Sequence, residues 1–154
     1  MMRRALTLGA AAAILVLVVA GSVAATDSAV QTRFTLVERA TSDAVIDLAP
    51  TGDSLGDLLA FGNNVYNAAN TTKVGRDEGS CSRTSPGVAW ECSWTVLLAH
   101  GSLVVQGPFY DSGRDSVLAI TGGTGIYRNA RGQMTLHARN KVGTAYDFIY
   151  AINL

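Results

Sequence analysis

The chain has 154 residues, and its 12 basic and 12 acidic side chains give a formal net charge of zero. Hydrophobic residues make up 48% of the sequence and charged residues 16%. The sequence has no basic patch, so nucleic acid is not an expected partner. The apolar content is enough for the core of one domain.

The N-terminus combines two arginines with a continuous apolar run. Arg3 and Arg4 precede the run at residues 5–20, and small residues follow around Ala24 and Ala25. This order is typical of a secretory signal peptide. The sequence therefore predicts a signal peptide over residues 1–25, cleaved near Ala24 or Ala25, and a secreted domain over residues 26–154. The alternative is an uncleaved membrane anchor formed by residues 5–20, although this run is short for a full span.

Residues 33–39 alternate clearly between apolar and polar side chains, which indicates a β-strand. Phe34, Leu36, Glu38 and Ala40 fall on one face, so Glu38 is expected inside, among apolar residues. A carboxylate there is costly unless it is hydrogen-bonded or protonated, which makes Glu38 the candidate catalytic residue. The alternative is a glutamate at the rim, in contact with water.

A second strand is expected over residues 57–66, after a polar loop at residues 41–53 that crosses the barrel mouth. Leu59, Phe61, Asn63 and Val65 share one face of this strand. Asn63 could orient a ligand oxygen, or it could satisfy a backbone group at a bulge. Both interpretations remain open from the sequence.

Residues 73–83 and 88–98 form the clearest hairpin, with its turn at Ser85-Pro86-Gly87. A turn centred on Pro86 and Gly87 places Cys81 directly opposite Cys92. Behind a signal peptide, this predicts a disulfide between the only two cysteines. The alternative is a free Cys81 thiol in a pocket.

Further short strands are expected at residues 102–106, ended by Gly107-Pro108, at residues 117–120, at residues 133–139 and at the C-terminus. Glycines 122, 123 and 125 predict a sharp corner between two of these strands. In the last strand, Tyr146, Phe148 and Tyr150 share one face with Ile152 and Leu154. Such an aromatic stripe suits a core, and in a small barrel it also suits a ligand cavity.

The sequence predicts no metal site and no cofactor. His100 and His137 lie in separate hairpins without ligand spacing, and no nucleophile elbow is present. The glycines after residue 121 lack the further glycine of a dinucleotide loop and the lysine of a P-loop. An inward carboxylate, an inward amide and several aromatic rings remain. They suit the binding of an apolar oxygenated molecule, or proton transfer during an isomerisation.

The segment Leu118-Ala-Ile-Thr-Gly-Gly-Thr-Gly-Ile-Tyr127, with Gly132-Gln133, resembles plant allene oxide cyclases and more loosely dirigent proteins. Ser54-Leu-Gly-Asp-Leu58, Gly79-Ser-Cys81 and Val105-Gln-Gly107 are similar to other strands of the cyclases. The resemblance implies an all-β fold: an eight-stranded antiparallel barrel with an apolar central cavity. It also implies a homotrimer.

In the cyclase family a glutamate on the first strand promotes ring opening of an unsaturated fatty-acid epoxide, and Glu38 stands at the matching position. Two elements that hold a water molecule against the epoxide oxygen are absent here: Ala40 replaces an asparagine, and a serine–proline pair has no counterpart. We therefore expect a secreted cyclase or isomerase acting on an apolar oxygenated molecule, or else a non-catalytic dirigent-like or lipocalin-like barrel. Resemblance and alternation together predict these ligand-binding residues: Leu59, Phe61, Asn63, Trp90, Phe109, Tyr146 and Phe148.

Overall fold

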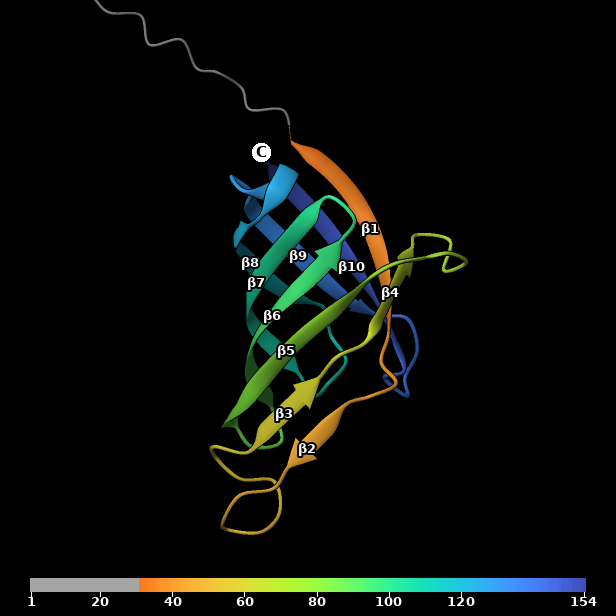
Figure 1. Ribbon diagram of the computed structural model, residues 1–154. Coiled ribbons are helices and arrows are strands. Elements are labelled where there is room, and N and C mark those ends of the chain that lie inside the picture. The colour runs from red at the N-terminus through yellow and green to blue at the C-terminus, as the bar shows by residue number, and fades with distance from the viewer. Residues whose placement is uncertain (1–30) are drawn as a thin grey trace, which may run out of the picture.

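The computed structural model describes residues 31–154 (Figure 1). This part of the chain contains ten strands and one short 3-10 helix, joined by turns and loops. The predicted signal peptide lies outside these residues. None of the helices within them has the length and apolar character needed to cross a bilayer. The elements are β1 (Thr32–Arg39), β2 (Ala44–Ile46), β3 (Leu58–Phe61), β4 (Asn64–Asn67), β5 (Lys73–Ser85), β6 (Ala89–Leu98), β7 (Gly101–Tyr110), β8 (Ser116–Gly123), η1 (Gly125–Tyr127), β9 (Arg131–Ala138) and β10 (Ala145–Asn153).

The strands close into a barrel because β5 pairs with β6 on one side and with β3 and β4 on the other. β3 and β4 lie against successive parts of β5 and together form one interrupted strand. In the same way, β1 pairs with β4 and β2 pairs with β3, so β1 and β2 also count as one interrupted strand. Counted in this way, eight antiparallel strands enclose the interior, which confirms the predicted fold.

The interruption between β3 and β4 corrects the prediction of one strand over residues 57–66. At Asn63 the backbone N–H donates to Asp77 Oδ1 at 2.9 Å instead of to a strand carbonyl. The Asp77 N–H in turn donates to the Asn63 carbonyl at 3.0 Å. A side chain thus replaces one ladder contact, and the strand breaks there.

Two other boundaries differ from expectation. The predicted loop at residues 41–53 contains β2, whose Val45 and Ile46 extend the sheet by pairing with β3. β7 does not end at Gly107-Pro108 but continues to Tyr110. Its register with β8 ends at Gln106, so Pro108 lies where β7 is paired only with β6. Proline is tolerated where a strand has a free edge.

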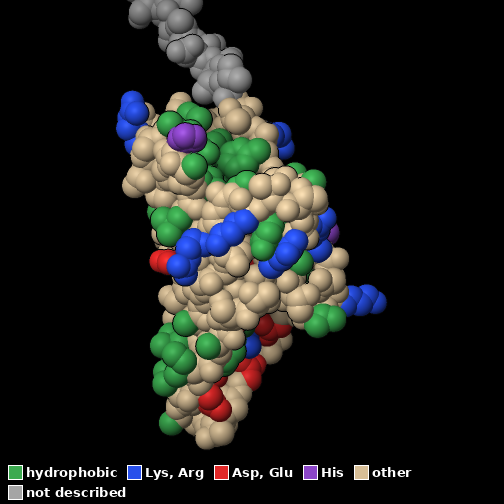
Figure 2. Space-filling model, turned by 45° about the vertical axis from the view of Figure 1, so that its right-hand side comes forward, with side chains coloured by type: hydrophobic (Ala, Val, Ile, Leu, Met, Phe, Trp, Pro, Cys, Tyr) green, Lys and Arg blue, Asp and Glu red, His purple; other side chains and the backbone are tan. Residues whose placement is uncertain are grey.

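β2 and β3 project beyond one end of the barrel (Figure 1). Figure 2 shows hydrophobic side chains exposed at this end of the molecule. Asp57 holds the connecting segment, because its carboxylate accepts hydrogen bonds from the backbone N–H groups of Leu48 and Ser54 at 2.9 and 2.8 Å. The exposed apolar residues of this projection are Val45, Ile46, Leu48, Leu55 and Leu58.

The barrel interior is filled at one end and hollow at the other. Towards the N-terminal end of β1, Phe34 stacks on the fully buried Tyr150 with ring centroids 4.8 Å apart. Towards its C-terminal end, Trp94 packs against Phe61 and Phe148 with centroids 5.9 and 5.7 Å away. These three rings line a cavity at this end of the barrel.

Gly79 makes room for this aromatic group. A Cβ atom at residue 79 would lie 2.2 Å from the Cβ of Trp94 and 2.9 Å from the ring of Phe61. The predicted corner after β8 is equally crowded: Gly125 has φ +58°, and a Cβ there would lie 2.1 Å from the carbonyl oxygen of His100. Each glycine permits a close approach that a side chain would block.

Cys81 and Cys92 are directly opposed in the register of β5 and β6 and form a disulfide. This confirms the pairing predicted from the hairpin turn. Both residues are buried and belong to the hydrophobic core.

We predict that Cys81→Ala/Cys92→Ala lowers the free energy of unfolding by about 3 kcal/mol, because the crosslink restricts the unfolded chain. Urea denaturation measures this loss. Reductant should destabilise the wild type by a similar amount and leave the double variant unchanged. Equal sensitivity of both proteins to reductant would contradict the prediction.

Candidate functional site

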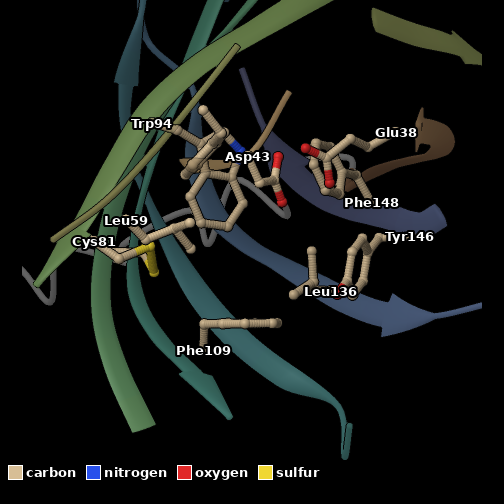
Figure 3. Close-up of a pocket in the computed structure, with 11 residues that line it drawn as sticks. Glu38, Asp43, Leu59, Cys81, Trp94, Phe109, Leu136, Tyr146 and Phe148 are labelled. Carbon is tan, nitrogen blue, oxygen red and sulfur yellow. A yellow bond between two sulfur atoms is a disulfide. The ribbon is translucent and has the colours of Figure 1, made fainter. Parts of the chain in front are cut away.

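A small apolar cavity lies inside the barrel at the end where the β1–β2 loop crosses it (Figure 3). Its volume is about 80 Å³. Pockets that enclose drug-sized ligands are larger, about 300–1,000 Å³. The cavity therefore accommodates only a small molecule or one end of a larger one. It is lined by Glu38, Asp43, Leu59, Phe61, Cys81, Cys92, Trp94, Phe109, Leu136, Tyr146 and Phe148.

A second, more polar cleft of about 790 Å³ lies between the β7–β8 and β9–β10 loops. It shares Phe109, Leu136 and Tyr146 with the cavity, so these three side chains border both spaces. Figure 3 shows the three residues on the same side of the cavity. Arginine and lysine side chains enter the lining of the cleft at Arg114, Arg139 and Lys141.

Glu38 reaches the cavity wall from β1, as its alternation predicts. Its side chain is only 6% exposed. Its carboxylate accepts a hydrogen bond from Asn63 Nδ2 at 2.8 Å, and the same amide donates to Asp43 Oδ1 at 2.7 Å. Burial, followed by the nearby charge of Asp77, raises the pKa of Glu38 well above its ordinary value.

Asn63 organises the mouth of the cavity. Its Oδ1 accepts hydrogen bonds from the backbone N–H groups of Thr41 and Ser42 at 2.9 and 3.0 Å, so it fixes the β1–β2 loop. Its Nδ2 holds the two carboxylates described above. The amide oxygen and both amide hydrogens of Asn63 therefore have partners within the protein, and its role in ligand binding stays a prediction.

Asp77 lies on β5 and is completely buried. Desolvation raises its pKa to about 6, partly offset by the hydrogen bond from the Asn63 backbone N–H. Tyr150 is also completely buried, and desolvation followed by the charges of Asp77 and Glu38 raises the pKa of its hydroxyl. Two buried polar side chains, Asp77 and Tyr150, thus lie behind the apolar cavity wall.

Six of the eight predicted catalytic and ligand-binding residues line the cavity: Glu38, Leu59, Phe61, Phe109, Tyr146 and Phe148. Their functional roles stay predictions.

Asn63 and Trp90 do not line the cavity. Trp90 faces the guanidinium of Arg83, which lies 3.8 Å from the ring centroid, and its Nε1 donates to Asp111 at 3.2 Å. Arg83 also pairs with Asp53 and Asp111, at 2.6 Å each. Trp90 therefore belongs to a polar clamp that ties β5 and β6 to the neighbouring loops.

Asp43, Asp77 and Leu136 belong to the site but were not singled out from the sequence. Alternation along β5 from the inward-facing Cys81 places Asp77 on the same inner face, so the sequence did contain a signal for its position. Leu136 follows from the same alternation in β9. Asp43 lies in a loop, where no periodicity predicts direction. Within residues 31–154, no three histidine, cysteine or acidic side chains are grouped to hold a metal ion.

The fold defines a small antiparallel barrel, of the class whose interior is filled by side chains or holds one small ligand. Residues 33–151 match the family model of allene oxide cyclase, and the chain belongs to this family. The match confirms the resemblance seen in the sequence motifs.

Solved structures with a similar fold carry different activities in their names. Pyocyanin demethylase is 25% identical, with a TM-score of 0.67 over 77% of this chain and 100% of its own. A pterocarpan synthase dirigent protein is 16% identical, with a TM-score of 0.62 over 79% and 82%. The Diels–Alderase AbmU from Streptomyces koyangensis is 12% identical, with a TM-score of 0.63 over 85% and 72%. The last two similarities concern the fold alone.

We predict that Asn63→Ala lowers the free energy of unfolding by about 3 kcal/mol or more, because it leaves buried carboxylate and N–H groups without partners. Asn64→Ala, at the exposed neighbouring position, should change it by less than about 0.5 kcal/mol. Thermal or urea unfolding compares the two variants. Equal effects would show that Asn63 does not organise the site.

Proposed function

We propose that the protein is a secreted cyclase or isomerase acting on an apolar, oxygenated small molecule of lipid or polyketide type. The observation that carries this proposal is the buried Glu38 carboxyl on the wall of an otherwise apolar cavity. A carboxyl group with a raised pKa suits acid–base work near neutral pH. The N-terminal sequence pattern and the disulfide support secretion.

The dimensions of the site suit an elongated or amphipathic ligand. The inner cavity takes a small apolar end beside Glu38, and the outer cleft takes the remainder past Phe109, Leu136 and Tyr146. In the cleft, Arg114 lies 3.6 Å above the ring of Tyr110, which offers a flat cationic surface to a polar group.

The reaction is proposed as cyclisation or isomerisation in general, not as the allene oxide cyclase reaction in particular. Ala40 supplies no polar group at the position where the family has an asparagine. Proteins of this fold include those named as Diels–Alderases and a demethylase, so the fold alone does not select a reaction.

A non-catalytic barrel is the second candidate, either dirigent-like or lipocalin-like. Dirigent proteins are among the structural neighbours, which favours it. In such a protein the cavity would bind and orient a molecule without changing it, and Glu38 would contribute only to affinity.

Glu38→Gln separates the two candidates. Candidate ligands come from mass spectrometry of small molecules that co-purify with the protein. An enzyme should lose turnover by about a hundredfold or more on removal of its acid–base group while its Kd for the ligand stays within a few-fold. Normal turnover in the variant would refute the catalytic role of Glu38, whereas an effect on Kd alone would favour the carrier.

Leu136→Trp tests the position of the ligand. Leu136 lines both the cavity and the cleft, so a larger side chain there should take up space in the proposed site and reduce co-purified ligand to a small fraction of the wild-type amount. Val117→Trp on the adjacent strand is the control, because Val117 is 51% exposed on the outer surface. Undiminished ligand in Leu136→Trp would place the binding site elsewhere.

A further inference from the structure

Two carboxyl groups lie together at the cavity wall. Glu38 comes from β1 and lines the cavity, whereas Asp77 comes from β5 and lies behind it. Asn63 donates to Glu38 through its side-chain amide at 2.8 Å, and the two carboxyl groups are within hydrogen-bonding reach of one another. Asp77 Oδ1 accepts the Asn63 backbone N–H at 2.9 Å. Its Oδ2 is buried and receives no hydrogen bond from any N–H or hydroxyl group of residues 31–154.

The surroundings do not neutralise two negative charges. Asn63 gives Glu38 one amide hydrogen and gives its other to Asp43, a third carboxylate at the mouth. The neighbouring cation, Arg76, is half-exposed and pairs with Glu78 at 3.0 Å.

Two tyrosines of β10 lie near the pair. Desolvation, followed by the charges of nearby carboxylates, raises the pKa of the Tyr146 and Tyr150 hydroxyls. Two buried carboxylates without a cation between them cannot both remain ionised at low cost.

A proton between the two groups removes this conflict. A protonated Glu38 becomes a donor, and the Asp77 carboxylate is an acceptor within its reach. One proton therefore leaves the pair with a single negative charge and can supply the hydrogen bond that Asp77 Oδ2 lacks. The break between β3 and β4 makes the pair possible, because Asn63 leaves the strand ladder to hold both residues.

We propose that Glu38 and Asp77 share one proton at neutral pH, and that Asp77 is a positioning residue that keeps the cavity supplied with that proton. The catalytic consequence rests on the function proposed above, whereas the shared proton does not. The pair suits a neutral ligand with an acceptor oxygen.

During isomerisation the proton of Glu38 passes to the ligand oxygen, which keeps the electron pair of its breaking C–O bond. A proton from a ligand carbon or hydroxyl then returns to the pair, and the electrons of that C–H or O–H bond form the new C=C or C–O bond to the electron-deficient carbon. The site ends in its starting state and needs no co-reactant.

Infrared titration tests the shared proton directly through the carbonyl stretch of protonated carboxyl groups. The wild type should retain one protonated carboxyl at neutral pH, and Glu91→Gln, at an exposed site on β6, should behave identically. In Asp77→Asn, the new amide donates to Glu38 and removes the repulsion. The remaining proton should then leave Glu38 at a pH lower by about one unit or more. A wild type without a protonated carboxyl at neutral pH would overturn the proposal, as would an unshifted Asp77→Asn titration.

Glu38→Gln provides the second test if Asp77→Asn fails to fold. The amide introduced by this substitution should donate to Asp77, so no carboxyl should stay protonated at neutral pH. Retention of the protonated carboxyl in this variant would also overturn the proposal.

Measuring turnover alongside the infrared titration separates the test of the shared proton from the test of the proposed function. If the pair also acts in catalysis, the basic limb of the kcat profile in Asp77→Asn should shift with the infrared titration. A merely structural role of Asp77 would lower kcat without moving this limb, and would refute the positioning role. If the infrared shift is observed but the wild type shows no turnover, the shared proton is supported and the proposed enzymatic function is refuted.

Discussion

The site depends on one amide side chain that lies where a strand is broken. Asn63 gives up regular pairing so that its backbone bonds to Asp77 and its side chain to Glu38, Asp43 and the β1–β2 loop. A continuous strand would satisfy the same backbone groups with less buried charge. The break is therefore a local cost in stability that places three carboxyl groups around one end of the barrel.

The division of the barrel into a filled end and a hollow end follows from the size of its side chains. An eight-stranded barrel has an interior just wide enough to be filled by side chains or to hold one small ligand. The stacked pair of Phe34 and Tyr150 fills one end, whereas Phe61, Trp94 and Phe148 line the cavity at the other end. Gly79 contributes by leaving room for Trp94 to approach.

Most of the fold was predictable because alternation and turn residues act locally. The hairpin turn at Pro86-Gly87 placed Cys81 opposite Cys92, and alternation placed Glu38 and Phe148 on the inner face. Alternation also placed Trp90 inward, and it is buried in the core. Near the end of β6, however, its ring contacts Arg83 and Asp111 and does not line the cavity. The role of Asn63 and the entry of Asp43 into the cavity depend on contacts between segments distant in sequence, which periodicity does not encode.

The crosslink between Cys81 and Cys92 has a consequence besides stability, because both residues line the cavity. The disulfide is therefore part of the cavity surface. Reduction would replace this inert, polarisable group with two thiols, and thiolates attack electrophilic carbon. For an electrophilic ligand of the kind proposed above, the oxidised pair would protect the protein from alkylation.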